Sequence, residues 1–237
     1  MKLSTPIYHL KRKARQLARV QAIPLHAALD RIAAEEGYSA WSLLAAKYAA
    51  LSPVTKLYSR LQAGDLVLVG ARPGQGKTLM ALELAVEAVK SGNPSFFFTL
   101  EYTEREAFGR LQTLDFEPEQ FGTELTLDCS DAICAAYIME RLTGARPNTL
   151  VVIDYLQLLD QRREHPPLAD QVSALKAFAQ ARGLVIVFIS QIDRSFDTAG
   201  KPFPDLHDVR LPNPLDLTLF GKTCFLNNGE IRLEAAA

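Results

Sequence analysis

Four residues between Ala71 and Met80 have the types and spacing needed to hold a phosphate group. Gly74 and Gly76 carry no side chain, so the backbone around them can curl and direct successive N–H groups at phosphate oxygens. Lys77 supplies an ammonium for the outer phosphates of a nucleotide, and the Thr78 hydroxyl can ligate Mg²⁺. This Gly-Lys-Thr ending of a P-loop predicts a site for a nucleoside triphosphate.

The loop departs from the usual G-x-x-x-x-G-K-[ST] pattern because Ala71 occupies its first position. An alanine costs little there if its φ is negative, since only a positive φ demands glycine. A strand predicted from Leu66 to Val69 and a helix predicted from Lys77 to Ser91 supply the context that a P-loop requires. The sequence predicts nucleotide contacts at Ala71, Arg72, Pro73, Gly74, Gln75, Gly76, Lys77, Thr78 and Leu79.

Three polar residues end other predicted strands. Asp154 closes the run LVVID and is expected to hold Mg²⁺ through water, whereas Glu101 follows FFFTL and is expected to act as general base for the attacking water. Gln191 closes VIVFISQ, and its amide can hydrogen-bond the γ-phosphate. Carboxyl ends of parallel strands meet at one edge of a sheet, so we expect all three to face the P-loop. The alternative for each is an ordinary strand-end polar group.

The elements that would position these residues alternate between apolar runs and helical patterns from Leu66 onward. Strands buried on both faces and separated by helices predict a parallel sheet in an α/β layer fold. Further helices are expected from about Thr103 and from about Ala169 to Arg182. Two strands turning at Asn228-Gly229 predict a C-terminal β-hairpin. A short all-helical segment is predicted before Ser52, which gives a helical appendage at 1–52 and a nucleotide-binding domain at 53–237.

Composition excludes some partners. The formal net charge is -1 and the pI about 6.4, so any contact with DNA must come from a local patch. No apolar run approaches the ~20 residues of a membrane helix, and the N-terminus lacks the apolar core of a secretory signal. Three cysteines form no C-x-x-C pair, which favours free thiols in a reducing cytoplasm over a metal site.

These motifs together resemble the RecA-like ATPase domain of the DnaB replicative helicase family. That family carries A-R-P-x-x-G-K-T, so Ala71 is its usual residue at this position. The similarity covers roughly Tyr58 to Leu233. The other matching stretches are Leu100-Glu101 with Arg110, the run Ile153-Asp154-Tyr155-Leu156-Gln157-Leu158, the sensor-like run from Ser190 to Ser195, and Asp205-Leu206.

The resemblance implies that ATP and Mg²⁺ bind here, with Glu101 as the catalytic carboxylate, Lys77 on the phosphates and Gln191 as sensor; Thr78 and Asp154 would hold the metal. It also implies a ring of subunits, with ATP at each interface and single-stranded DNA in the central channel. Loops after Asp160 and Gln191 would line that channel. The candidate DNA contacts are Arg162, Arg163, Arg194, Lys201 and Arg210. The alternative is that these residues are ordinary solvated charges of the loops.

Two features depart from the family pattern. Some fifty helical residues stand in place of the family's N-terminal collar domain, and their basic first helix could contact DNA, a neighbouring subunit or its own domain. The family's penultimate strand ends in K-x-R-N-G, whose cations reach the neighbour's ATP site, whereas Phe225 and Asn227 hold those positions here. The arginine-finger positions therefore look vacant, and Lys222 is a substitute only if the alignment slips.

The sequence thus predicts an ATP-hydrolysing, DnaB-helicase-like protein that acts on or near single-stranded DNA, with unwinding left open. The alternative is a nucleotide-switched regulatory or adaptor protein of the same fold without helicase activity. Vacant finger positions favour the alternative, and the intact Glu101 favours hydrolysis. A kinase of a small metabolite is less favoured, because no lid or acceptor-binding segment is visible.

Overall fold

The computed structural model describes residues 3–4, 7–50, 52–112, 122–160, 164–211, 213–228 and 230–235. The chain forms two compact units, Met1–Leu61 and Gln62–Ala237. The sequence places a boundary after Ser52, whereas the compact units divide after Leu61, because the short helix that follows Ser52 groups with the first unit. The assignment of domains at 1–52 and 53–237 stays a prediction.

The first unit is helical, as the sequence predicts. It contains α1 (Ile7–Gln21), α2 (Leu25–Glu35), α3 (Trp41–Ala49) and α4 (Pro53–Tyr58). The apolar stripe of α1 packs on α2, because residues spaced three or four apart share one face of a helix. The buried side chains at this contact are Leu10, Ala14, Ala28 and Ile32.

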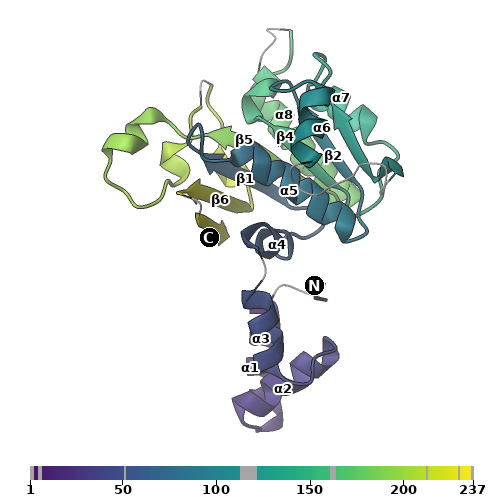
Figure 1. Cartoon of the computed structure of the whole chain (residues 1–237), viewed down its shortest axis with the longest axis vertical. Helices are drawn as coiled ribbons and strands as arrows, with labels where there is room; N and C mark the ends of the chain where they lie inside the picture. The colour runs from purple at the N-terminus through teal and green to yellow at the C-terminus, as the bar shows by residue number, and fades with distance from the viewer. Residues whose placement is uncertain are drawn as a thin grey trace. The chain divides into compact units, whose positions relative to one another are not determined.

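The second unit is built on a seven-stranded sheet with the order β3-β2-β4-β5-β1-β6-β7 (Figure 1). All neighbouring strands run parallel except β6 and β7, which form the predicted antiparallel hairpin. The predicted α/β fold is therefore confirmed. The strands are β1 (Leu66–Ala71), β2 (Ser95–Thr99), β3 (Leu125–Asp128), β4 (Leu150–Asp154), β5 (Val185–Gln191), β6 (Lys222–Asn227) and β7 (Glu230–Ala235).

Helices cover both faces of this sheet (Figure 1). On one face, α7 (Ala135–Arg141) and α8 (Leu168–Arg182) pack with apolar side chains of the central strands. The residues of α5 (Lys77–Lys90) contact β1 to β5, and α6 (Glu104–Gln112) follows β2. Among the helices that the structure describes, none is long and apolar enough to cross a membrane.

Strand β1 lies between β5 and β6 and extends to Ala71, past the predicted end at Val69. The extension is possible because Gly70 leaves room for its neighbours. A Cβ at Gly70 would lie 2.9 Å from Ile192 Cδ1 and 3.0 Å from the Phe225 ring. Among the described α-helices and strands, three were not predicted: α4, β3 and α7. β3 has four residues, of which only the last is fully buried, so it lacks the long apolar run of the central strands.

We expect Gly70→Ala to lower the free energy of unfolding by about 1–3 kcal/mol, because the added methyl group overpacks the contact with Ile192 and Phe225. Gly144→Ala is the matched control, since its Cβ would meet nothing within 4 Å and its φ is not positive. Urea denaturation followed by circular dichroism measures both. Equal stability of the two variants would contradict the tight packing of β1.

Candidate nucleotide-binding site

The predicted P-loop connects the end of β1 to the start of α5. Gly74 has φ +81° and Gly76 has φ +78°, values that side-chain-bearing residues rarely adopt. Ala71 is the last residue of the strand and is not among the described residues with positive φ. An alanine at this first position is therefore compatible with the loop. Gly76 caps α5, so the first N–H groups of that helix are available to phosphate oxygens.

Two P-loop side chains hold the loop to its neighbours. Arg72 donates to both carboxylate oxygens of Asp197, from Nε at 2.9 Å and from Nη2 at 2.7 Å, and its Nη1 donates to the Ile192 carbonyl at 2.9 Å. The Gln75 side chain accepts from the Asn228 N–H at 2.9 Å, at the turn of the β6–β7 hairpin. These bonds fix the loop from two sides. They also commit the Arg72 guanidinium to protein partners, so its predicted role at the nucleotide stays a prediction.

Lys77, Thr78, Glu101 and Asp154 come together at the carboxyl edge of the sheet. The Lys77 Nζ lies 4.0 Å from Glu101 Oε2. Both side chains are partly accessible, whereas Asp154 is 0% exposed. These side chains thus lie at the carboxyl ends of parallel strands, next to the P-loop.

The Asp154 carboxylate is buried without a hydrogen-bond partner among the described residues. Burial raises the pKa of Asp154 to about 6, and the charge of Glu101 acts in the same direction. The Thr78 hydroxyl and the cations of Lys77 and Arg110 lower that pKa. The Thr78 hydroxyl is near enough to lower this pKa, but neither Asp154 oxygen makes a hydrogen bond to a described residue. A buried anion in this state is unfavourable until a cation arrives.

Gln191 ends β5 and faces a pocket of about 220 Å³ lined by Tyr155, Gln157, Gln191 and Arg210. The Arg210 Nη1 donates to Gln191 Oε1 at 3.4 Å, and the Arg210 N–H donates to the Gln191 carbonyl at 2.8 Å. Gln157 Nε2 in turn donates to the Arg210 carbonyl at 2.7 Å. Sequence reasoning missed this cluster, because Gln157 and Arg210 meet only in the folded chain.

Comparison with known proteins decides the family. The family model described as the DnaB-like helicase C terminal domain matches residues 47–117 and 122–213 of this chain. The chain belongs to this family. Over 186 residues it is 28% identical to the replicative DNA helicase DnaB of Leifsonia xyli subsp. xyli (strain CTCB07), covering 65% of this chain and 41% of that protein. Over 239 residues it is 26% identical to the replicative DNA helicase DnaB of Pasteurella multocida (strain Pm70), covering 83% of this chain and 50% of that protein. The chain thus spans half the length or less of these two relatives.

Solved structures support the RecA-like fold of this DnaB-like chain. A solved ATPase domain superposes with a TM-score of 0.59 at 20% identity, covering 79% of this chain and 81% of that chain. A DnaB-like replicative helicase, solved in a study of its interactions with primase, also gives a TM-score of 0.59, at 18% identity, covering 92% of this chain and 64% of that one. At these identities the likeness establishes the fold.

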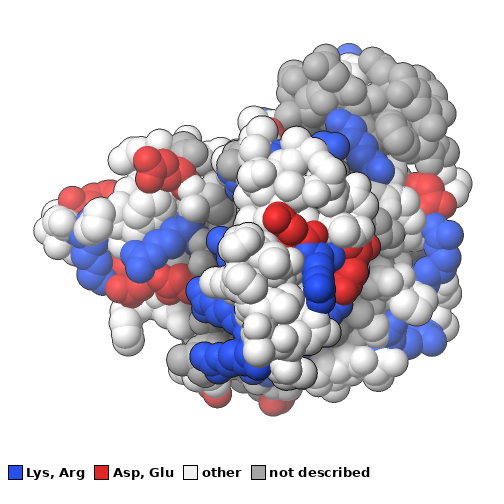
Figure 2. All heavy atoms as spheres, turned by 90° about the horizontal axis from the view of Figure 1, so that it is seen from below, with Lys and Arg blue, Asp and Glu red and all other residues white. Residues whose placement is uncertain are grey.

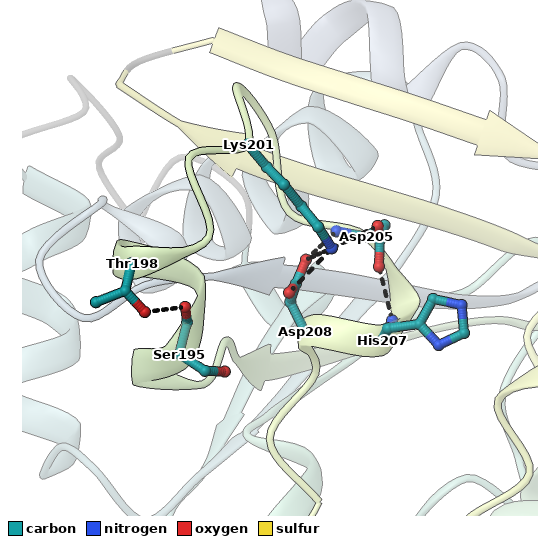
Figure 3. Close-up of polar contacts among 6 residues, drawn as sticks. All are labelled: Ser195, Thr198, Lys201, Asp205, His207 and Asp208. Carbon is teal, nitrogen blue, oxygen red and sulfur yellow. Dashed lines mark hydrogen bonds and ion pairs between the residues drawn. The ribbon is translucent and has the colours of Figure 1, made fainter.

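The candidate DNA contacts of the DnaB-like chain fall into different settings. Arg162 and Arg163 lie outside the described residues. Arg194 is exposed at the start of a short helical turn, Arg194–Thr198. Lys201 Nζ pairs with Asp205 at 3.0 Å and with Asp208 at 3.2 Å (Figure 3). These carboxylates compete with a phosphate for Lys201. Arg210 is exposed and hydrogen-bonded to Gln191.

The positions expected to carry the family's trans-acting cations are filled differently. Phe225 is fully buried in the core beside Gly70, and Asn227 Nδ2 donates to the Pro202 carbonyl at 2.8 Å. Lys222 lies at the opposite end of β6 from Asn227, is buried, and forms an ion pair with Asp65 before β1. This pair would have to break before the Lys222 ammonium could reach a neighbouring subunit, and its use as a substitute finger stays a prediction.

Asp154 makes stability depend on pH. Its folded pKa of about 6 lies above its ordinary value of 3.8. Below about pH 3.8 the group is protonated in both states and carries no penalty; as pH rises through 6 the folded state must bury the charge, at ~3 kcal/mol for about two pKa units. We expect Asp154→Asn to raise the free energy of unfolding by up to ~3 kcal/mol near pH 8 without nucleotide, and by much less near pH 4.

Asp128→Asn is the matched control for this prediction. Asp128 is also buried, but its carboxylate accepts hydrogen bonds from Tyr137 and Arg141. Its substitution should therefore destabilise the protein near pH 8. Urea titrations at the two pH values measure the effect, and a loss of stability in both variants would contradict the unpaired state of Asp154.

Proposed function

We propose that this chain binds ATP with Mg²⁺ and hydrolyses it to ADP and phosphate, as the ATPase part of a DnaB-helicase-like protein. The observation that carries the proposal is the buried Asp154 carboxylate, which lacks a partner among the described residues and lies at the same edge as Lys77 and Thr78 of the P-loop. A structural aspartate at this depth would be hydrogen-bonded or ion-paired. An unpaired one fits a residue that works with a bound cation.

The residues present fit Mg²⁺. Oxygen ligands are the donors this hard cation prefers, and it usually keeps several waters. The Thr78 hydroxyl would bind it directly, and Asp154 would hold it through water. When bound, the metal offsets phosphate charge and polarises the γ-phosphoryl group. Lys77 would contact the outer phosphates, while the N–H groups of the loop around Gly74 and Gly76 would bind the rest of the triphosphate.

Hydrolysis then needs an oriented water. The water oxygen bonds to the γ-phosphorus while the bond from that phosphorus to the β,γ-bridging oxygen breaks, and ADP leaves with the electron pair. Glu101 accepts the water proton, a role supported by its partial exposure and its position 4.0 Å from the Lys77 ammonium. Before the proton transfer, the Lys77 charge would stabilise the Glu101 carboxylate. After it, the same charge would stabilise the phosphates.

Gln191 would sense the γ-phosphate and transmit its loss. Its side chain and carbonyl are both bonded to Arg210, and the intervening loop begins at Ile192, whose carbonyl accepts from Arg72. A shift of the Gln191 amide therefore acts directly on this loop. We place single-stranded DNA at the loops after Asp160 and Gln191. Among the candidate contacts that the structure describes, we favour Arg194. Its guanidinium is exposed, whereas Lys201 is held by carboxylates.

We expect Lys77→Ala to weaken ATP binding at least ~100-fold, because it removes the cation that faces the outer phosphates. Glu101→Gln should bind ATP normally and hydrolyse it ~10²–10⁴-fold more slowly, the usual range for loss of a general base. Calorimetric titration measures binding, and phosphate release measures turnover.

Matched controls separate these effects from general damage. Lys90→Ala removes an exposed cation from the other end of the same helix, and Glu104→Gln removes an exposed carboxylate just beyond Glu101. Both should behave as wild type. Normal ATP binding with no hydrolysis by the wild-type chain would instead support the nucleotide-switched adaptor, and equal turnover of wild type and Glu101→Gln would remove Glu101 as the base.

We also propose that any ring or dimer of this chain has catalytically incomplete sites, since Phe225 and Asn227 offer no cation to a neighbour. Turnover per chain should then stay constant within about twofold as protein concentration rises a hundredfold, because a missing finger removes a ~10³–10⁵-fold effect on rate. Phosphate release across that range, with sedimentation to follow association, measures this. If turnover per chain increases as the chains associate, another cation acts as the finger in the neighbouring site.

A further inference from the structure

Positive charge is concentrated in the first unit. Within residues 1–61 ten Lys and Arg stand against three Asp and Glu, although the whole chain has a net charge of -1. The remainder of the chain is therefore net negative. An asymmetry of this kind between two parts of a chain is typical of contact with a polyanion.

The three carboxylates of this unit are occupied locally. Asp30 accepts the Trp41 N–H at 2.8 Å, and Glu36 accepts the Ser4 N–H at 2.8 Å. Glu35 pairs with Lys13 of α1 at 2.6 Å. Within the described residues, no carboxylate lies within 4.0 Å of the other four cations of α1, and none stands in the α1 sequence. These four cations have no neutralising partner inside the described part of the unit.

The four unpaired cations form one stripe, which we call the α1 stripe: Lys11, Arg12, Arg15 and Arg19. All four side chains are exposed. At 100° per residue they lie within about 100° of arc, away from the buried face of Leu10 and Ala14, and extend about 12 Å along the helix. Figure 2 shows basic side chains lying next to one another on part of the face it draws.

We propose that the α1 stripe binds the phosphate backbone of double-stranded DNA without reading its sequence. Arginine suits this role because its planar guanidinium matches phosphate geometry with two donors. About 12 Å of stripe spans three to four phosphates of one B-form strand at 3.4 Å spacing. The stripe belongs to the first unit, whereas the residues of the proposed ATP site belong to the second, and α1 precedes the stretch matched to the helicase family.

Two observations separate DNA from other polyanions. A helix that binds a membrane inserts its apolar face, but the apolar face of α1 is already buried against α2. Proteins that bind single strands add aromatic side chains on which bases stack, and the exposed positions of α1 from Lys11 to Gln21 contain no aromatic residue. Duplex DNA, with one charge per ~1.7 Å of axis, is the densest backbone for such a stripe.

The test uses the full chain without nucleotide, so that it does not depend on the proposed ATPase. The stripe variant carries Lys11→Gln, Arg15→Gln and Arg19→Gln. The control variant carries Lys13→Gln, Arg31→Gln and Lys47→Gln, which removes the same charge from the same unit but at cations engaged with Glu35, Gln21 and the Tyr38 ring. Glutamine is a good helix former, and helix content is checked by circular dichroism.

Binding of a labelled duplex of about 30 base pairs is measured by fluorescence anisotropy across a range of NaCl concentrations. We expect the stripe variant to bind at least tenfold more weakly at low salt and to lose about 3 from the log–log salt slope, at ~0.9 per phosphate contact. The control variant should stay within about threefold of wild type. A charge-preserving variant, Arg15→Lys with Arg19→Lys, should keep the salt slope even if affinity falls modestly.

Four outcomes would overturn the proposal. They are no duplex binding by the wild-type chain, equal loss in the stripe and control variants, stripe-dependent binding of the single strand in preference to the duplex, and stripe-dependent binding of phosphatidylserine vesicles without binding of DNA. Equal loss in the stripe and control variants would mean that the net charge of the unit, and not the position of the stripe, determines DNA binding. None of these results bears on Lys77 or Glu101, so failure here is distinguishable from failure of the ATPase proposal.

Discussion

The buried charge of Asp154 is the constraint on which the rest of the site depends. Burying an unpaired carboxylate is unfavourable, and here the penalty falls on an interior strand of the sheet. The surrounding core must supply the free energy that offsets this penalty, and β4, an interior strand between β2 and β5, is buried along its whole length. A cation bound beside Asp154 would offset this penalty, so any such ligand would also stabilise the fold.

Three contacts join the P-loop and Gln191 to distant parts of the chain. Arg72 reaches the turn after β5 through Asp197, Gln75 reaches the hairpin turn at Asn228, and Gln191 is bonded to Arg210. The loop that leaves β5 is therefore attached at its start, through Arg72, and near its end, through Arg210. Both attachments begin at residues of the candidate site, so the loop and the site are held to one another by hydrogen bonds.

Local spacing is enough to predict the central features. The P-loop context, the strand-end positions of Glu101, Asp154 and Gln191, and the hairpin at Asn228 follow from patterns within a few residues and from the rule that parallel strands end at one edge. The burial of Phe225, the Asp65–Lys222 ion pair and the Arg72–Asp197 bonds could not be predicted in this way. Each depends on which strands become neighbours, and their partners are separated by more than a hundred residues.

Phe225 also limits how this chain can evolve. Its ring fills the space beside Gly70, so exchanging it for a cation would bury an unpaired charge and leave a void together. Those two penalties approach the ~5–15 kcal/mol that holds a whole domain folded. The substitution becomes tolerable only after the residues around Gly70 have changed. A cation could therefore be introduced at this end of β6 by a single substitution at Asn227, which is only half-buried, but not by one at Phe225.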